Sequence, residues 1–153
     1  MSHGFSIRTV TPDDKTSWLR MRDALWPDES RSHAGEIDRY LAGQLTMPLE
    51  VLIAVDDGGS AIGFAELSIR AYAEDCETDR VAYLEGWYVD PAWRRTGVGR
   101  ALVVAAEQWA RSQGCTEFGS DALLDNDVSA AAHLALGFEE TVQLRCFRKS
   151  LQR

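Results

Sequence analysis

The sequence has little cysteine and no long apolar run. Its three cysteines, Cys76, Cys115 and Cys146, are widely spaced and include no CxxC pair, which argues against a zinc site and favours free thiols in a reducing compartment. No apolar run reaches the roughly 18 residues that a membrane span needs, and the N-terminal segment has no apolar signal-peptide core. We therefore predict a cytoplasmic protein with no bound metal and no membrane partner.

Basic residues are also scarce. The chain has 16 lysines and arginines against 24 aspartates and glutamates, a formal net charge of −8. This balance argues against nucleic acid as a partner and would steer a cationic substrate favourably, although solubility alone explains it equally well. With 153 residues, 45% hydrophobic and 26% charged, the composition predicts one globular domain spanning residues 1–153.

Local patterns predict an α+β fold. The residues predict helices at about 12–26, 33–46, 98–113 and 127–136, from capping residues, Pro27, Gly114, Gly137 and helical spacing of apolar side chains. Strands are expected at 5–10, 51–55, 61–69, 81–89 and 116–120, with 138–151 as a final strand pair or one long strand. This order predicts a mixed, mostly antiparallel central sheet with helices on both faces.

A turn rich in arginine and glycine follows the predicted strand 81–89. Gly97 and Gly99 stand two residues apart at the start of an amphipathic helix, and three arginines surround them: Arg94, Arg95 and Arg100. Glycines let backbone N–H groups approach an anion closely, and a helix N-terminus adds positive charge. The spacing matches neither common nucleotide-binding loop. The turn therefore indicates a pyrophosphate site of another kind, and its alternative is a plain helix start with solvated arginines.

The stretch EGWYVDPAWRRTGVGRAL, residues 85–102, resembles the acetyl-CoA site of the GNAT superfamily of N-acyltransferases. NDVS at 126–129 and HLALGFEET at 133–141 resemble its second cofactor segment. LWP at 25–27, IGFA at 62–65, LEG at 84–86 and SD at 120–121 make the chain most similar to bacterial aminoglycoside 6′-N-acetyltransferases. The resemblance covers nearly the whole chain and implies a GNAT fold, an acetyl-CoA co-substrate and antibiotic resistance.

The resemblance implies a set of cofactor-binding residues. The strand ending at Val89 would splay from its neighbour after a bulge, so that its backbone can bind pantetheine, as in strand addition. The arginine-rich turn would bind the pyrophosphate. The implied residues are Trp87, Tyr88, Val89, Arg94, Arg95, Thr96, Gly97, Val98, Gly99, Arg100 and Asn126. For Asn126, a helix cap or turn residue is an equally good interpretation.

Four residues are implied on the acceptor side. Glu85 and Asp121 would face one cleft, where carboxylates bind an ammonium group or relay its proton. Trp26 and Tyr72 would contact the aminoglycoside, Tyr72 on a loop that also holds Glu74, Asp75, Glu77 and Asp79. Each has a plain alternative: an exposed strand residue, a cap or loop acid, core packing for Trp26, and a merely solvated loop.

One departure from the family concerns the proton donor. Many related enzymes carry a tyrosine near the C-terminal strand, where this chain has Phe147, so the general acid stays unassigned. The resemblance implies direct acetyl transfer to a primary amine in a ternary complex, and a homodimer formed through the final strand. Two alternatives remain open: a GNAT enzyme acting on a polyamine, small metabolite or protein N-terminus, and a non-catalytic acetyl-CoA-binding module.

Overall fold

The computed structural model describes residues 4–27 and 32–152. The chain divides into two compact units, with the boundary between Asp121 and Ala122, and each unit is described by itself. The larger unit holds a five-stranded sheet in the order β1-β2-β3-β4-β5. The first four strands pair antiparallel, and β5 runs parallel to β4. The predicted α+β class with a mixed, mostly antiparallel sheet is confirmed.

The element bounds follow the local sequence signals closely. In the larger unit they are β1 (Phe5–Thr9), the 3-10 turn η1 (Pro12–Asp14), α1 (Lys15–Leu25), α2 (His33–Leu41), β2 (Glu50–Asp56), β3 (Ala61–Arg70), β4 (Val81–Val89), the 3-10 turn η2 (Pro91–Trp93), α3 (Val98–Ser112) and β5 (Phe118–Ser120). The smaller unit contains α4 (Asp127–Ala135). Thr11 is the N-terminal cap of the first helical segment, and its N–H donates to the Asp14 carboxylate at 2.7 Å.

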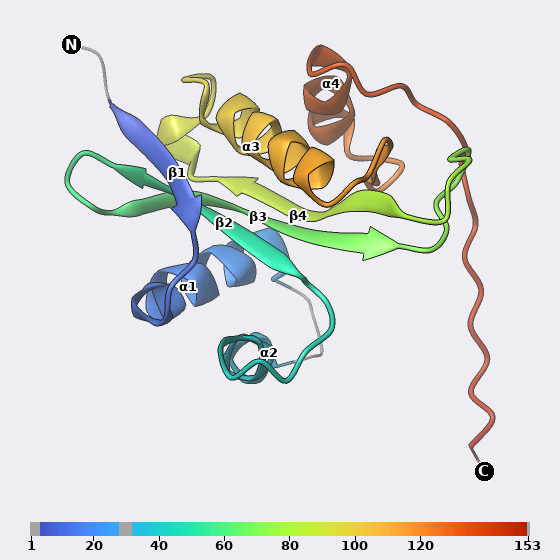
Figure 1. The fold of residues 1–153 in the computed structure, drawn as a ribbon, viewed down its shortest axis with the longest axis horizontal. Helices are drawn as coiled ribbons and strands as arrows, with labels where there is room; N and C mark the ends of the chain where they lie inside the picture. Colours follow the sequence, from blue (N-terminus) through green and yellow to red (C-terminus); the bar gives the residue numbers. More distant parts are fainter. Residues whose placement is uncertain (1–3, 28–31, 153) are drawn as a thin grey trace. The chain divides into compact units, whose positions relative to one another are not determined.

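Helices cover both faces of the sheet in the larger unit. Figure 1 shows α1 and α2 on one face and α3 on the other. On the α1 face, Trp18 and Met21 pack with Phe64 of β3 in the main core cluster. On the α3 face, Leu102 approaches Gly63, where an added Cβ would lie 3.4 Å from its Cδ1. Burial of these apolar side chains covers both faces of the central strand, β3.

A β-bulge interrupts β4. Glu66 of β3 lies opposite Gly86, but the next residue, Leu67, lies opposite Leu84. Glu85 is therefore an extra residue on β4, which bends a strand and redirects its side chains. On its other side, β4 pairs with β5 only from Ala82 to Leu84, although β4 continues to Val89. The bulge that the family resemblance implied is present, and the β5 ladder ends where it begins.

Two predicted elements differ in the structure. The second helix ends at Leu41, short of the expected 46. Gly43 has φ +73°, and the Gln44 N–H donates to the Arg39 carbonyl at 2.9 Å. A left-handed glycine of this kind closes a helix and satisfies its last carbonyls. The apolar spacing beyond Leu41 therefore wrongly predicted that the helix continues to about residue 46.

The predicted final strand is the larger correction. Within the described residues, 138–152 form no helix or strand, and Val142, Leu144, Phe147 and Leu151 are exposed. A strand exists only when a neighbour accepts and donates its ladder hydrogen bonds. Alternating apolar residues supply the pattern of a strand without supplying that partner. The prediction of a final strand pair or one long strand at 138–151 was therefore wrong.

Candidate functional site: a bulged strand beside an arginine-rich helix start

The turn before α3 has the backbone of an anion-binding loop. Arg95 and Gly97 have positive φ, +64° and +97°. The first α-helical hydrogen bond of α3 runs from the Ala101 N–H to the Gly97 carbonyl at 3.0 Å. The N–H groups of Val98, Gly99 and Arg100, which come before Ala101 in the first turn of α3, therefore have no carbonyl partner within the helix. Gly97 tolerates this left-handed conformation at no steric cost.

The same helix start lies directly against β4. A Cβ at Gly99 would lie 3.2 Å from Cζ2 of Trp87, so glycine there lets the helix approach the strand. Arg94 donates from Nε to the Val89 carbonyl at 3.0 Å. The side chains of Arg94, Arg95 and Arg100 are exposed, and none joins an ion pair among the described residues. This combination of backbone donors and arginines fits a pyrophosphate group.

The bulge residue Glu85 is paired with an arginine. Arg70 donates to both carboxylate oxygens, from Nη2 to Oε1 at 2.5 Å and from Nε to Oε2 at 3.1 Å. The Arg70 Cζ lies 3.6 Å from the centre of the Tyr83 ring. Tyr83 in turn donates its hydroxyl to Oδ2 of Asp121 at 2.7 Å. The two predicted acceptor carboxylates, Glu85 and Asp121, are thus joined through two residues on neighbouring parts of β3 and β4.

Trp26 packs against β4 beside the bulge, over Gly86. It is the C-terminal cap of α1, and a Cβ at Gly86 would lie only 2.7 Å from its Cη2. His33 stacks on its ring with 6.1 Å between centroids and 27° between planes, and Phe64 contacts it edge-on at 6.5 Å. The half-buried indole therefore packs over the residue that follows Glu85. Both the core-packing interpretation and the proposed wall of the site agree with this position.

A buried polar cluster lies behind Trp26. Glu66 accepts from Arg22 Nε at 2.7 Å and from the Trp18 indole at 3.0 Å, and Arg22 also donates to Glu36 at 2.7 Å. Burial opposes the charge on Arg22, but its hydrogen bonds to Glu66 and Glu36 outweigh that and raise its pKa. The guanidinium lies 5.2 Å from the Trp26 ring centre.

His33 links this cluster to the Trp26 backbone. Its Nδ1 lies 3.3 Å from Arg22 Nη1, and its Nε2 lies 3.2 Å from the Trp26 carbonyl oxygen. A guanidinium can only donate, so Nδ1 accepts and Nε2 carries the proton. His33 therefore contacts both the indole ring and the backbone carbonyl of Trp26.

Two other predicted site residues, Tyr72 and Asn126, take no part in the contacts described above for Glu85, Asp121 and Trp26. Tyr72 is 69% exposed on the loop after β3. In that loop, the amides of Glu77 and Thr78 donate to the Glu117 carboxylate. In the smaller unit, Asn126 accepts from the Ser129 N–H at 3.0 Å and so caps α4. Its cap role is confirmed, and its contact with a cofactor stays a prediction.

Arg70, Tyr83 and the cluster around Glu66 were missed from the sequence. Arg70 directly follows the predicted strand 61–69, and no sequence signal assigned it a role in the site. One signal was available: Glu66 is the single charged residue inside the apolar run 61–69, and a carboxylate in a buried strand requires a partner. The identity of that partner depends on how α1 packs on the sheet, which local sequence does not specify.

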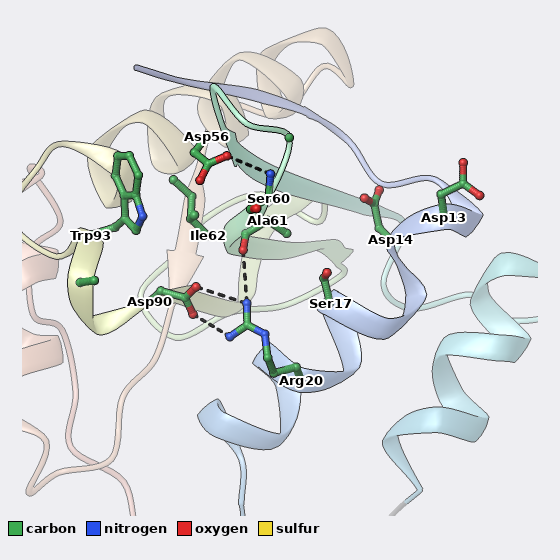
Figure 2. Close-up of a pocket in the computed structure, with 12 residues that line it drawn as sticks. Asp13, Asp14, Ser17, Arg20, Asp56, Ser60, Ala61, Ile62, Asp90 and Trp93 are labelled. Atoms are coloured by element: carbon green, nitrogen blue, oxygen red, sulfur yellow. Dashed lines mark hydrogen bonds and ion pairs between the residues drawn. The ribbon is translucent and has the colours of Figure 1, made fainter. Parts of the chain in front are cut away.

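A separate hollow lies at another place on the larger unit. It has a volume of about 640 Å³ and is lined by Asp13, Asp14, Ser17, Arg20, Asp56, Gly59, Ser60, Ala61, Ile62, Asp90, Ala92 and Trp93. Figure 2 shows Arg20 reaching across it to Asp90 and the Ala61 carbonyl. None of the predicted site residues lines it, and much of its polar lining is already hydrogen-bonded within the protein. We do not assign it to the site.

Residues 4–27 and 32–152 contain no group of three or more histidine, cysteine, aspartate or glutamate side chains arranged to hold a metal ion. None of the helices in this part of the chain combines the length and apolarity needed to span a bilayer.

Comparison with known proteins identifies the class to which this fold and site belong. The profile of the Acetyltransferase (GNAT) family matches residues 18–138, and the chain belongs to that family. It is 58% identical to an aminoglycoside N(6′)-acetyltransferase type 1 of Klebsiella aerogenes, over 95% of this chain and 96% of the relative.

Solved structures agree with this assignment. The 6′-N-acetyltransferase AAC(6′)-Ih of Acinetobacter baumannii is 41% identical with a TM-score of 0.87, covering 97% of this chain and 100% of that one. AAC(6′)-Iy, in complex with a bisubstrate analogue of coenzyme A and acetylneamine, is 36% identical with a TM-score of 0.85, covering 96% and 99%.

The position of Trp26 gives a direct test. We expect Gly86→Ala to lower the free energy of unfolding by about 1–3 kcal/mol, because its Cβ would overlap the indole. The same change in a Trp26→Ala background should cost clearly less. Urea unfolding of the four proteins measures both values, and Gly58→Ala, whose Cβ meets nothing closer than 3.4 Å, is the control. Equal costs in the two backgrounds would show that Trp26 does not lie over Gly86.

Proposed function

We propose that the protein is an aminoglycoside 6′-N-acetyltransferase that uses acetyl-CoA and confers antibiotic resistance. The observation that carries this proposal is the bulge at Glu85. It places the Glu85 carboxylate in one chain of contacts with Asp121, a pair suited to a cationic amine, on a strand that leads to a helix start suited to a pyrophosphate. The 58% identical relative is named for this activity. The acidic net charge of −8 further favours a polycationic acceptor over a neutral one.

The cofactor would be held by the strand and turn described above. The backbone of Trp87, Tyr88 and Val89 continues beyond the β5 ladder, which supports its pairing with the amides of pantetheine. The pyrophosphate would lie on the amides of Thr96 to Arg100, with the side chains of Arg94, Arg95 and Arg100 adding charge. Asn126 would contribute its side-chain N–H₂, since its oxygen caps α4.

The acceptor would be held by residues around the bulge. Trp26 and Tyr72 would contact the sugar rings, and Glu85 and Asp121 would bind the ammonium group and help to remove its proton, through water. When bound, acetyl-CoA supplies a thioester that the neutral amine attacks directly in a ternary complex. The backbone N–H near Val89 would polarise the acetyl carbonyl. Much of the rate would come from holding the two reactants together.

The proton donor to the leaving thiolate stays unassigned in this scheme. Phe147 carries no proton and lies in the smaller unit, where it is exposed. Either water or another group protonates the thiolate, or the thiolate leaves unprotonated because of its own low basicity, or the enzyme is slower than its relatives. No covalent acyl-enzyme is required, because the sequence shows no evident pairing of a cysteine with a histidine.

Assembly and location are further parts of the proposal. The exposed apolar side chains in 142–151 support a homodimer in which this segment gains a strand partner from a second copy. The free thiols of Cys76, Cys115 and Cys146 support a cytoplasmic location. The family match over 18–138 spans both compact units, which supports their acting as one acetyltransferase domain.

The function is tested by acetyl transfer to kanamycin. We expect thiol release that depends on both acetyl-CoA and kanamycin, and NMR should place the new amide on the 6′-nitrogen. A polyamine and a peptide N-terminus serve as comparison acceptors. Faster turnover of either comparison acceptor would assign the protein to another amine, and binding of acetyl-CoA without turnover of any acceptor would indicate a non-catalytic module.

The two carboxylates make a second prediction. Glu85→Gln and Asp121→Asn should each lower kcat/KM for kanamycin by about 10²-fold or more, because each removes a charge that binds or deprotonates the amine. Calorimetry should find the affinity for acetyl-CoA nearly unchanged in both variants. Glu107→Gln, at an exposed surface pair with Arg111, is the matched control. Unchanged kinetics in both cleft variants would remove this assignment.

A further inference from the structure

The polar side chains of Arg70, Glu85, Tyr83 and Asp121 form one continuous chain of contacts. Arg70 donates to both carboxylate oxygens of Glu85. It also stacks on Tyr83, with 3.6 Å between the Arg70 Cζ and the ring centre. The Tyr83 hydroxyl in turn donates to Asp121 at 2.7 Å. Both candidate acceptor carboxylates are therefore fixed by the same guanidinium, one directly and the other through a ring.

The geometry fixes the guanidinium of Arg70 tightly. Glu85 binds its edge in the two-pronged arrangement that lysine cannot reproduce, and the Tyr83 ring lies against its flat face. The Arg70 side chain is 36% exposed and that of Glu85 is 17% exposed, so water competes only in part for this pair. Hydrogen bonds to Glu85 raise the pKa of Arg70, against the opposing effect of its burial.

Tyr83 is held in its donor form. Burial of its phenol, together with the hydrogen bond to Asp121, raises its pKa well above the ordinary value. The hydroxyl therefore keeps its proton at neutral pH and donates it to one oxygen of Asp121. The other oxygen of Asp121 and the remaining lone pairs of Glu85 are the acceptor positions left for an ammonium group.

We propose that Arg70 is the positioning residue of the acceptor site: its guanidinium sets the orientation of Glu85 at the bulge and, through the Tyr83 ring, that of Asp121. This inference rests on the proposed function. Arg70 touches neither substrate in this scheme and acts only through the two carboxylates.

The test is a double-mutant cycle on kanamycin acetylation. Arg70→Met should lower kcat/KM for kanamycin at least about tenfold, the loss expected for a charged two-pronged contact, while KM for acetyl-CoA stays within about twofold. Arg70→Lys keeps the charge without the fork and should recover only part of the loss. In a Glu85→Gln background, Arg70→Met should add little, because the residue through which it acts is already altered.

The controls separate this role from a general effect on folding. Arg111→Met removes a guanidinium from an exposed pair and should leave kcat/KM unchanged. Acetyl-CoA calorimetry on each variant shows that the protein is folded. Equal losses for Arg70→Met in the wild-type and Glu85→Gln backgrounds, or full activity of Arg70→Met, would overturn the proposal while leaving the proposed function intact.

A crystal structure of Arg70→Met gives a readout that does not need turnover. The Glu85 carboxylate should leave the position in which Arg70 holds it in the wild-type protein. If the wild-type protein fails to acetylate kanamycin, the proposed function fails, and this structure still decides whether Arg70 positions Glu85. An unmoved Glu85 carboxylate would overturn the positioning role by itself.

Discussion

The site depends on a single extra residue in β4. Glu85 has no opposite residue on β3, so the alternation of side chains along β4 shifts by one residue there. Tyr83 and Gly86, three residues apart, therefore lie on the same face of the strand, on either side of Glu85. The β5 ladder ends one residue earlier, at Leu84. The bulge and the end of the β5 ladder together serve the two halves of the proposed chemistry. The bulge presents a carboxylate, and β4 continues to Val89 without β5 as its neighbour.

The rest of the larger unit supports that irregularity from two sides. On the α3 face, glycine at position 99 brings the positive end of the helix against Trp87. On the α1 face, the cluster of Glu66, Arg22 and His33 supports Trp26. A buried ion pair is expensive to desolvate and contributes little net stability. Its value here is geometric, because a fully bonded cluster holds one aromatic ring beside the bulge.

Local patterns in the sequence predicted much of this architecture. The strands of the sheet and the helix start at Gly97 follow from alternation, glycine placement and helical spacing, which are properties of neighbouring residues. The pairing of Arg70 with Glu85 could not be predicted, because it depends on strand register across a bulge, and one residue of shift reverses every side chain. The segment 138–151 shows the converse limit, since its strand-like pattern has no partner among the described residues of one chain.

Amide hydrogen exchange with and without coenzyme A tests the proposed cofactor site most directly. We predict that the cofactor slows exchange in residues 87–89 of β4 and in the first turn of α3, since those amides would become its hydrogen-bond donors. Exchange in the paired strands β1 and β2, far from the bulge in the strand order, should not change. Equal exchange at 87–89 and at the α3 start in the two states, under conditions that saturate the protein with coenzyme A, would contradict the proposed cofactor site.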